Sequence, residues 1–307
     1  MKRKIKVLIT GAKGFVGSNL TVFLKSKNCK VFSLGKDNFN LLNLSQIQKK
    51  IKNIKPDYVV HCASKSGGVK YNLDYPATIF HENFAMLTNL FLALKKTKVK
   101  KLILLCNSCI YSSSIKGRFR EEQLFYGEPD RSSLSTSFSK LGFIIGAKAN
   151  KFENKLNSTC LIIPNLYGPK DNFKDENAHF ISSIIKKIYK AKLKRKRFVN
   201  LWGSGKEIRD TLFVEDLCEA IYKIIKMNKN IDVINISNGT GYTIEKYSEI
   251  IKSILDKRIK LRWSQNLSGV KRKVLNNNKM LKIMRWKPKT NISLGLTKTI
   301  NWYINNR

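Results

Sequence analysis

Three glycines near the N-terminus have the spacing of a phosphate-binding turn. Gly11, Gly14 and Gly17 follow the apolar run 5–10 and precede an amphipathic stretch. In that context the first glycine permits a tight turn, the second lets the backbone approach a pyrophosphate, and the third lets the helix pack closely on the strand. Three unrelated turn glycines are the alternative, which the flanking strand and helix patterns disfavour. The spacing predicts a dinucleotide site.

The end of the second expected strand indicates which dinucleotide binds. An acid at that position hydrogen-bonds the ribose of NAD, whereas a base accommodates the extra phosphate of NADP. Lys36 stands about there and Lys13, in the glycine turn, is a second candidate, while Asp37 could still be the ribose acid. Lysine is common throughout the chain, so these residues favour NADP(H) while leaving NAD(H) open.

The first half of the chain alternates short apolar runs with amphipathic stretches. Strands are expected at 4–10, 30–34, 57–62 and 101–106, and helices at 19–27, 44–52 and 83–95. This alternation is typical of a parallel sheet with helices on its faces. We expect an α/β fold with a Rossmann-type, doubly wound parallel sheet in residues 1–165. A smaller α/β C-terminal lobe in residues 166–307 would hold the substrate. The boundary is approximate, and an interleaved arrangement is left open.

The composition excludes several classes of protein. The chain has 307 residues of which 42% are hydrophobic, enough to bury a core, so it is neither a small disulfide scaffold nor disordered. None of the six cysteines forms a CxxC pair of the metal-binding kind, which indicates a reducing compartment and no metal site. Glycines interrupt the basic start before a signal-peptide core is complete, and no apolar run approaches the ~20 residues of a membrane span. We expect a cytoplasmic protein without a membrane span.

The chain is strongly basic. Lys and Arg number 59 against 21 Asp and Glu, a formal net charge of +38 that invites an anionic partner. Residues 186–197 form the densest run, compatible with a nucleic-acid or lipid patch and equally with a solvated face. Because no nucleic-acid module accompanies the run, we expect a solvated face and no nucleic-acid partner.

Several further segments resemble the GDP-L-fucose synthases, extended short-chain dehydrogenases/reductases that epimerise and reduce a nucleotide sugar. The matching segments occur in order along nearly the whole chain: 55–63 (KPDYVVHCA), 67–68 (GG), 107–111 (NSCIY), 165–169 (NLYGP), 171–173 (DNF), 202–205 (WGSG) and 209–210 (RD). The resemblance implies a nucleotide-diphosphate sugar as substrate. It also implies a homodimer formed through helices near 83–96 and 140–155.

The resemblance assigns proton chemistry to Cys109 and His179. In that family a cysteine and a histidine act as base and acid at carbons 3 and 5 of a 4-keto sugar. Protons beside a ketone are acidic enough for a thiolate to remove, and an imidazole can return a proton near neutral pH. An isolated cysteine is more often packing material, but its place in 107–111 favours the catalytic role for Cys109. His61 and His81 are expected to be structural.

The sequence departs from the family at the reductive step. The family uses a serine and a YxxxK pair, in which lysine helps tyrosine pass a proton to the ketone oxygen. Lys140 is present, but Thr136 occupies the tyrosine position and Asn107 the serine position, with Ser108 beside it. Threonine is too short to replace a phenol and too weak an acid. We expect slow or absent ketone reduction.

Other groups could take over the proton transfer. Asn107 can still donate a hydrogen bond to a carbonyl, and Ser108, Ser135, Ser137 or a held water could relay a proton. Tyr126 could reach the site if its loop folds back. Lys140 also contacts the nicotinamide ribose in this superfamily, so its retention supports cofactor binding even without reduction.

The remaining assignments concern binding. The predicted cofactor residues are Gly11, Lys13, Gly14, Phe15, Val16, Gly17, Lys36, Ala63, Lys140, Asn165, Leu166 and His179. For the nucleotide sugar the resemblance suggests Asn165 near the pyrophosphate, Lys187 and Arg209 as phosphate partners, and Trp202 beside the sugar nucleotide. Lys187 could equally be a solvated lysine in a basic helix. The loop 267–270 (LSGV) lacks the family's usual Pro-Asp-Gly, which leaves the sugar contacts open.

Three functions are compatible with these features. The first is an NADP(H)-dependent epimerase/reductase acting on a GDP-4-keto-6-deoxy sugar. The second is an enzyme of the same fold that uses a different keto sugar or performs only the epimerisation. The third is a noncatalytic nucleotide-sugar-binding homologue.

Overall fold

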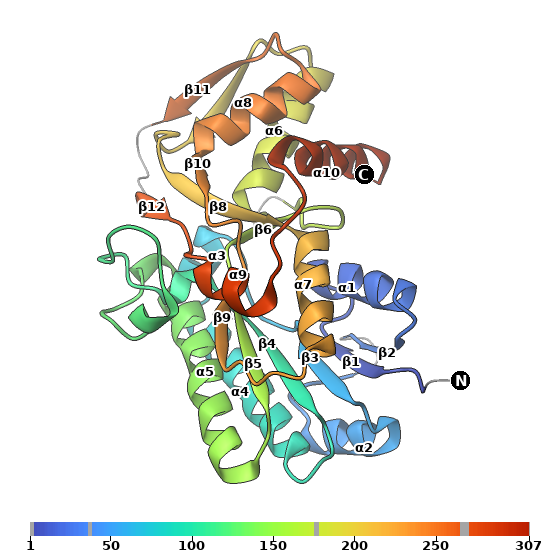
Figure 1. Ribbon diagram of the computed structural model, residues 1–307. Coiled ribbons are helices and arrows are strands. Elements are labelled where there is room, and N and C mark those ends of the chain that lie inside the picture. The colour runs from blue at the N-terminus through green and yellow to red at the C-terminus, as the bar shows by residue number, and fades with distance from the viewer. Residues whose placement is uncertain (1–2, 36–38, 175–177, 265–269, 307) are drawn as a thin grey trace.

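A six-stranded parallel sheet forms the base of the molecule (Figure 1). The computed structural model describes residues 3–35, 39–174, 178–264 and 270–306. The strand order is β2-β1-β3-β4-β5-β9. The strands are β1 (Lys6–Thr10), β2 (Lys30–Leu34), β3 (Tyr58–His61), β4 (Lys101–Asn107), β5 (Ser158–Ile163) and β9 (Val233–Asn235). The predicted Rossmann-type α/β fold is confirmed.

Helices cover both faces of this sheet. Successive strand residues point to opposite faces, so Val7 and Ile9 of β1 belong to one apolar core and Leu8 to the other. The helices on the Val7 side are α1 (Phe15–Ser26), α7 (Val214–Lys226) and α9 (Asn278–Met284). The helices on the Leu8 side are α2 (Leu44–Ile54), α4 (Pro76–Leu94) and α5 (Leu134–Asn154). Both faces are buried, as a parallel sheet requires.

The strand order changes direction at β1, whose neighbours are β2 and β3. The chain reaches β2 through α1 on one face and reaches β3 through α2 on the other. Such a switch point opens a crevice at the carboxyl ends of the strands, where ligands bind in doubly wound folds. The glycine turn and residues 62–65 both lie at this edge.

A smaller α/β lobe lies above the carboxyl edge of the sheet in Figure 1. Its strands are β6 (Asn165–Tyr167), β7 (Phe198–Trp202), β8 (Ile208–Phe213), β10 (Gly241–Thr243), β11 (Lys260–Ser264) and β12 (Arg272–Lys273). Its helices are α6 (Phe180–Leu193), α8 (Ile244–Leu255) and α10 (Ile292–Asn305). A third apolar core, which includes Tyr167, Ile185 and Phe213, joins these elements.

The chain passes between the two parts more than once. After β5 it enters the lobe, returns to the first sheet as α7 and β9, and returns again as α9. Strand β9 pairs with β5 although it follows residue 166, so part of the range 166–307 belongs to the first sheet. The division into 1–165 and 166–307 stays a prediction.

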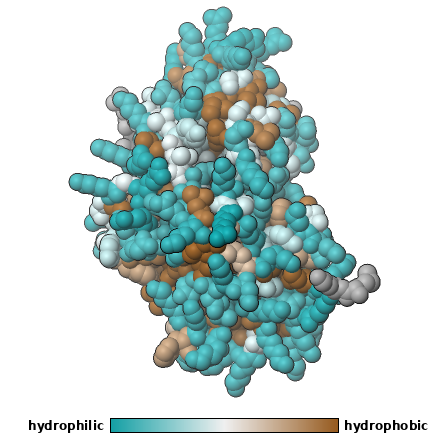
Figure 2. All heavy atoms as spheres, in the orientation of Figure 1, coloured by the Kyte–Doolittle hydropathy of each residue, from teal (hydrophilic) through white to brown (hydrophobic). Residues whose placement is uncertain are grey.

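The surface is largely hydrophilic on the face that Figure 2 shows. Within the basic run 186–197, Ile188 and Tyr189 of α6 are buried, whereas residues 192–197 are all exposed. No helix in the described part of the chain is long and apolar enough to cross a membrane.

Candidate active site

The glycine turn folds as its spacing predicts. Gly11 has φ +66°, and a Cβ there would lie 2.6 Å from the backbone nitrogen of Ala63. A Cβ on Gly17 would lie 2.2 Å from the carbonyl oxygen of Gly11. Gly14 caps α1, so Phe15 and Val16 open the helix with amides that have no partner within it. The turn thus presents a helix N-terminus to the crevice, an arrangement that favours phosphate groups.

Lys13 extends from this turn toward the end of β2. A Cβ on Gly35 would lie 3.0 Å from the Lys13 Cγ, so the lysine stem covers this glycine. Gly35 directly follows β2, the position at which a dinucleotide's adenosine ribose is recognised in this architecture. Lys36 and Asp37 lie outside the described residues.

Cys109 lies just beyond β4, in the short 3₁₀ helix Ser108–Ile110. The hydroxyl of Ser137 on α5 donates to the carbonyl oxygen of Cys109 at 2.9 Å, which ties this turn to the helix. The Cys109 side chain is half-buried, and its Sγ is 3.7 Å from the Nζ of Lys273. The thiol therefore faces a cation rather than an apolar packing environment.

Lys273 and Arg209 reach this region from adjacent strands. The parallel pairing of β12 with β8 sets Lys273 opposite Arg209. Nη1 of Arg209 donates to the carbonyl oxygens of Ile208 and Val270, at 3.0 and 2.7 Å. Burial lowers the pKa of Arg209, and the charge of Cys109 is among the groups that oppose this shift. The pairing thus brings Arg209 and Lys273 together with Cys109.

Thr136 is hydrogen-bonded to a neighbouring helix. Its hydroxyl donates to Oδ1 of Asn72 on α3 (Val69–Asp74). The Asn72 amide nitrogen donates to the carbonyl oxygens of Gly67 and Gly68, at 3.0 and 2.9 Å. These two acceptors fix the orientation of the amide, so Thr136 must supply the proton of its own hydrogen bond.

Lys140 follows Thr136 by one helical turn, and its side chain is buried. Its Nζ lies 4.1 Å from the centroid of the Phe143 ring. Burial lowers the pKa of Lys140 to about 8, because the charged ammonium loses its hydration. The third reductive position, Asn107 at the end of β4, has a buried Oδ1 with no hydrogen bond to any described residue.

His179 caps the N-terminus of α6. Its Nδ1 lies 3.4 Å from Oδ1 of the buried Asp171, and this hydrogen bond raises the pKa of His179. Asp171 also accepts hydrogen bonds from the Ser182 hydroxyl and, at 2.7 Å, from the backbone nitrogen of Asn172. No hydrogen bond or ion pair among the described residues joins His179 to Cys109. Their convergence on one sugar stays a prediction.

The other predicted substrate residues form two groups. Nζ of Lys187 lies 4.8 Å from the centroid of the Trp202 ring, which is 70% exposed. The ammonium also donates to the carbonyl oxygen of Asn200 at 3.3 Å. Asn165 and Leu166 open β6, two residues after the strand position that pairs with Asn107. These two therefore lie at the carboxyl edge of β4 and β5.

Comparison with known proteins identifies the family. Residues 7–237 match the family described as NAD dependent epimerase/dehydratase. The chain belongs to this family. It is 30% identical to GDP-L-colitose synthase of Yersinia pseudotuberculosis, over 99% of both chains. It is also 30% identical to the probable GDP-L-fucose synthase 1 of Oryza sativa subsp. japonica, over 98% of this chain and 92% of that protein.

Solved structures of this epimerase/dehydratase type share the fold. A GDP-6-OMe-4-keto-L-xylo-heptose reductase from C. jejuni superposes with a TM-score of 0.91 at 23% identity, covering 100% of this chain and 99% of that chain. A GDP-L-fucose synthetase from Naegleria fowleri bound to NADP gives 0.90 at 22% identity, covering 100% and 94%. The resemblance to GDP-L-fucose synthases found in the sequence is confirmed, and the chain is an enzyme of this epimerase/reductase class.

Sequence reasoning missed three residues that contact the predicted site residues: Asn72, which binds Thr136, Asp171 as the partner of His179, and Lys273 beside Cys109. Asp171 carried a signal, because 171–173 was one of the segments that resembled the family. Lys273 and Asn72 carried none, since each acts on a residue far away in the sequence.

Proposed function

We propose that this chain is an NADP(H)-dependent epimerase/reductase of a GDP-4-keto-6-deoxy sugar that exchanges protons at carbons 3 and 5 faster than it reduces the ketone. The observation that carries the proposal is the Cys109 thiol, placed just past the carboxyl end of β4 with a lysine ammonium 3.7 Å from its sulfur. A thiol beside a cation is suited to act as a base, because the cation stabilises the thiolate.

The glycine turn fits a dinucleotide. Gly11 and Gly17 let the turn fold tightly, because a Cβ at either would collide with neighbouring backbone, and the first amides of α1 point to the same edge of the sheet. Lys13, lying over Gly35, supports the phosphate-bearing NADP(H) over NAD(H). Lys140, Asn165 and Leu166 would hold the other end. When bound, the nicotinamide supplies the hydride for the carbonyl carbon.

Cys109 and His179 would divide the epimerisation between them. The Cys109 thiolate removes a proton from a carbon beside the ketone, and the adjacent Lys273 ammonium stabilises the negative charge before and after the transfer. His179 returns a proton, for which its Asp171 partner prepares it by favouring the imidazolium.

Arg209 supports the assignment of a nucleotide diphosphate. Its guanidinium is anchored through Nη1 to two carbonyl oxygens, which leaves Nη2 and Nε to donate to a diphosphate. The Lys187 ammonium over the exposed Trp202 ring would add a second cation beside an aromatic surface. Guanine as the base of the nucleotide is supported by the relatives, whose names specify GDP-linked sugars.

A second candidate, an epimerase that does not reduce, is favoured by the hydrogen bond of Thr136. The hydroxyl proton of Thr136 is committed to Asn72, so it is withheld from a ketone oxygen. One experiment separates the candidates. The protein is incubated with GDP-4-keto-6-deoxymannose and NADPH in D₂O, and deuterium at carbons 3 and 5 and oxidation of NADPH are followed together.

Deuterium uptake that is lost in Cys109→Ser, with slow NADPH oxidation, supports the proposed function. Uptake without any NADPH oxidation supports the epimerase. No uptake by the wild-type protein, despite measurable binding of the nucleotide sugar, would instead indicate a noncatalytic homologue. Rapid NADPH oxidation would contradict the slow reductive step.

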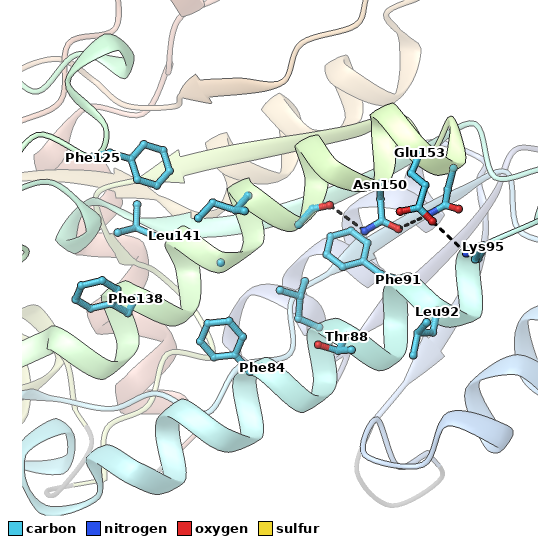
Figure 3. Close-up of a pocket in the computed structure, with 15 residues that line it drawn as sticks. Phe84, Thr88, Phe91, Leu92, Lys95, Phe125, Phe138, Leu141, Asn150 and Glu153 are labelled. Atoms are coloured by element: carbon cyan, nitrogen blue, oxygen red, sulfur yellow. Dashed lines mark hydrogen bonds and ion pairs between the residues drawn. The ribbon is translucent and has the colours of Figure 1, made fainter.

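A homodimer is part of this proposal. A groove of about 620 Å³ runs between α4 and α5, lined by apolar side chains of both helices (Figure 3). Gly142 and Gly146 let the helices approach closely, because a Cβ at either would lie 2.6 Å from a phenylalanine ring of α4. Leu92 and Ile145 are 47% and 57% exposed at its rim. A second copy that packs the same two helices here would remove this apolar surface from water.

A further inference from the structure

The ammonium of Lys140 is buried without a counter-ion. Lys140 is 6% exposed, and no described residue offers its Nζ a hydrogen bond or an ion pair. Among the described residues, the face of the Phe143 ring is the one partner of this Nζ, which lies 4.1 Å from the ring centroid. Contact with a ring face compensates for only part of the free energy that the ammonium loses when it gives up its hydration. The side chain therefore holds its extra proton weakly.

The ionisable groups around Lys140 do not supply a negative charge that would balance its ammonium. His61 and Cys62 lie at the end of β3, and burial lowers the pKa of His61 to about 3 and raises that of Cys62 to about 12. Both are therefore neutral at physiological pH. Cys106 of β4 also faces Lys140, and its thiol donates to the Lys140 carbonyl oxygen at 3.7 Å. Burial accordingly lowers the pKa of Lys140 to about 8.

The nearby hydroxyls on α5 have already committed their protons. Thr136 donates to Asn72, Ser137 donates to the carbonyl oxygen of Cys109 at 2.9 Å, and Ser139 donates to the carbonyl oxygen of Thr136 at 2.8 Å. None of the three can donate to a substrate carbonyl without breaking a hydrogen bond. An ammonium is also a far stronger acid than an aliphatic hydroxyl. These three hydroxyls are therefore poorly placed to replace the missing phenol.

We propose that Lys140 is itself the general acid of the reductive step and donates an ammonium proton to the ketone oxygen, directly or through one water. The inference rests on the proposed function. Lys140 lies one helical turn after Thr136 on the same face of α5, beside the carboxyl ends of β3 and β4. Its acidity is close to the operating pH, which suits general acid catalysis.

The proposed step balances. The carbonyl π bond breaks as its carbon gains a hydride from a reduced nicotinamide and its oxygen gains a proton from Lys140. Lys140 is left as a neutral amine, a form that its buried site tolerates better than the ammonium. It regains a proton from water before the next turnover. No further oxidant or reductant is needed.

The first test measures the amine of Lys140 in the cofactor-free protein. Trace labelling with acetic anhydride over a series of pH values, followed by mass spectrometry, gives the reactivity of each lysine. Lys140 is expected to show a midpoint near pH 8, whereas the exposed Lys148 on the same helix serves as the ordinary lysine. A midpoint for Lys140 that matches Lys148 would overturn the proposal.

The second test measures a single turnover of NADPH with excess enzyme and the keto sugar. Lys140→Arg keeps the cation but does not give up its proton, so oxidation should fall by about 10²-fold or more. Each variant is assayed at an NADPH concentration that saturates it by fluorescence, because Lys140 also belongs to the predicted cofactor site, and Lys148→Arg should behave as wild type. In Lys140→Ala, primary amines added to the buffer should restore oxidation.

Three results would overturn the proposal: an undiminished Lys140→Arg rate, no rescue of a folded, NADPH-binding Lys140→Ala, or a wild-type protein that oxidises no NADPH in this assay. Deuterium exchange at carbons 3 and 5 is followed in the same samples. Its persistence would keep the proposed epimerisation in place when the Lys140 proposal fails, and its absence in wild type would reject the proposed function instead.

Discussion

Lys273 follows Cys109 by 164 positions in the chain, yet its ammonium nitrogen lies 3.7 Å from the Cys109 sulfur. The contact depends on the short strand β12, which pairs with β8 and sets Lys273 opposite Arg209. A cysteine that serves only as packing material has no need of such neighbours, because burial among apolar groups suffices. Cationic surroundings instead make a thiol reactive, since they stabilise its anion.

Removing the positive charge of Lys273 should therefore slow proton exchange. We expect Lys273→Gln to reduce deuterium uptake at carbons 3 and 5 by about tenfold or more, and Lys273→Arg to retain most of it. NMR of the sugar in D₂O measures both rates. The exposed Lys271→Gln, two residues away, controls for a general loss of charge. Equal rates in Lys273→Gln and Lys271→Gln would count against a role for Lys273.

A tyrosine restored at position 136 should accelerate ketone reduction. Thr136 is buried and bonded to Asn72, so space for a phenol requires the double variant Thr136→Tyr, Asn72→Ala. We expect NADPH oxidation to rise at least about tenfold, because Lys140 can then lower the pKa of a phenol one turn away. The matched variant Thr136→Phe, Asn72→Ala lacks only the hydroxyl. Similar rates in the two variants would contradict the expectation.

Local sequence signals predicted the elements that build the cofactor edge. The bounds expected for the second strand, 30–34, agree with β2. Two helices begin earlier than expected. Helix α4 begins at Pro76 rather than 83, since proline suits a first helical position. Helix α1 begins at Phe15 rather than 19, so it includes Gly17 of the glycine turn. Strands of two or three residues, such as β9 and β12, are too short for periodicity to reveal.

The site was predictable where one segment acts alone and unpredictable where distant segments meet. The glycine turn is complete within residues 11–17, and the absence of tyrosine at 136 is visible in the sequence itself. By contrast, the bond between Thr136 and Asn72 joins positions 64 residues apart. Sequence spacing carries no information about such contacts, because they depend on how α3 packs against α5.

The pH dependence of exchange should report the pairing of His179 with Asp171. Asp171 raises the pKa of His179, so the imidazolium persists to higher pH than in an isolated histidine. If His179 acts as an acid, exchange declines as pH rises through that pKa. Asp171→Asn should move this decline to lower pH, while Ser182→Ala, which removes another hydrogen bond of Asp171, should move it less. An unchanged alkaline limb in Asp171→Asn would exclude the pairing as a determinant of activity.

Asp210 should make the folded protein less stable as pH rises. Burial raises the pKa of this carboxyl from 3.8 to about 8, so the folded state binds more protons than the unfolded state between those values. The free energy of unfolding that Asp210 contributes is complete below about pH 4 and is lost up to about pH 8, with a slope of at most about 1.4 kcal/mol per pH unit. Asp210→Asn should flatten this part of the profile. Urea denaturation at pH 5 and pH 8 measures it, and an equal decline in both proteins would refute the assignment.

The groove between α4 and α5 should decide the oligomeric state. Its exposed apolar residues cluster on two neighbouring helices, and the groove lies apart from the residues that surround Cys109. A charge buried there without a partner would oppose association strongly. We expect wild type to be a dimer by light scattering and Ile145→Asp combined with Leu92→Asp to be a monomer at micromolar concentration. Val22→Asp, at a residue 59% exposed on α1, controls for adding an acid to a basic surface. A wild-type monomer, or a dimer that survives the double substitution, would place any association elsewhere on the molecule.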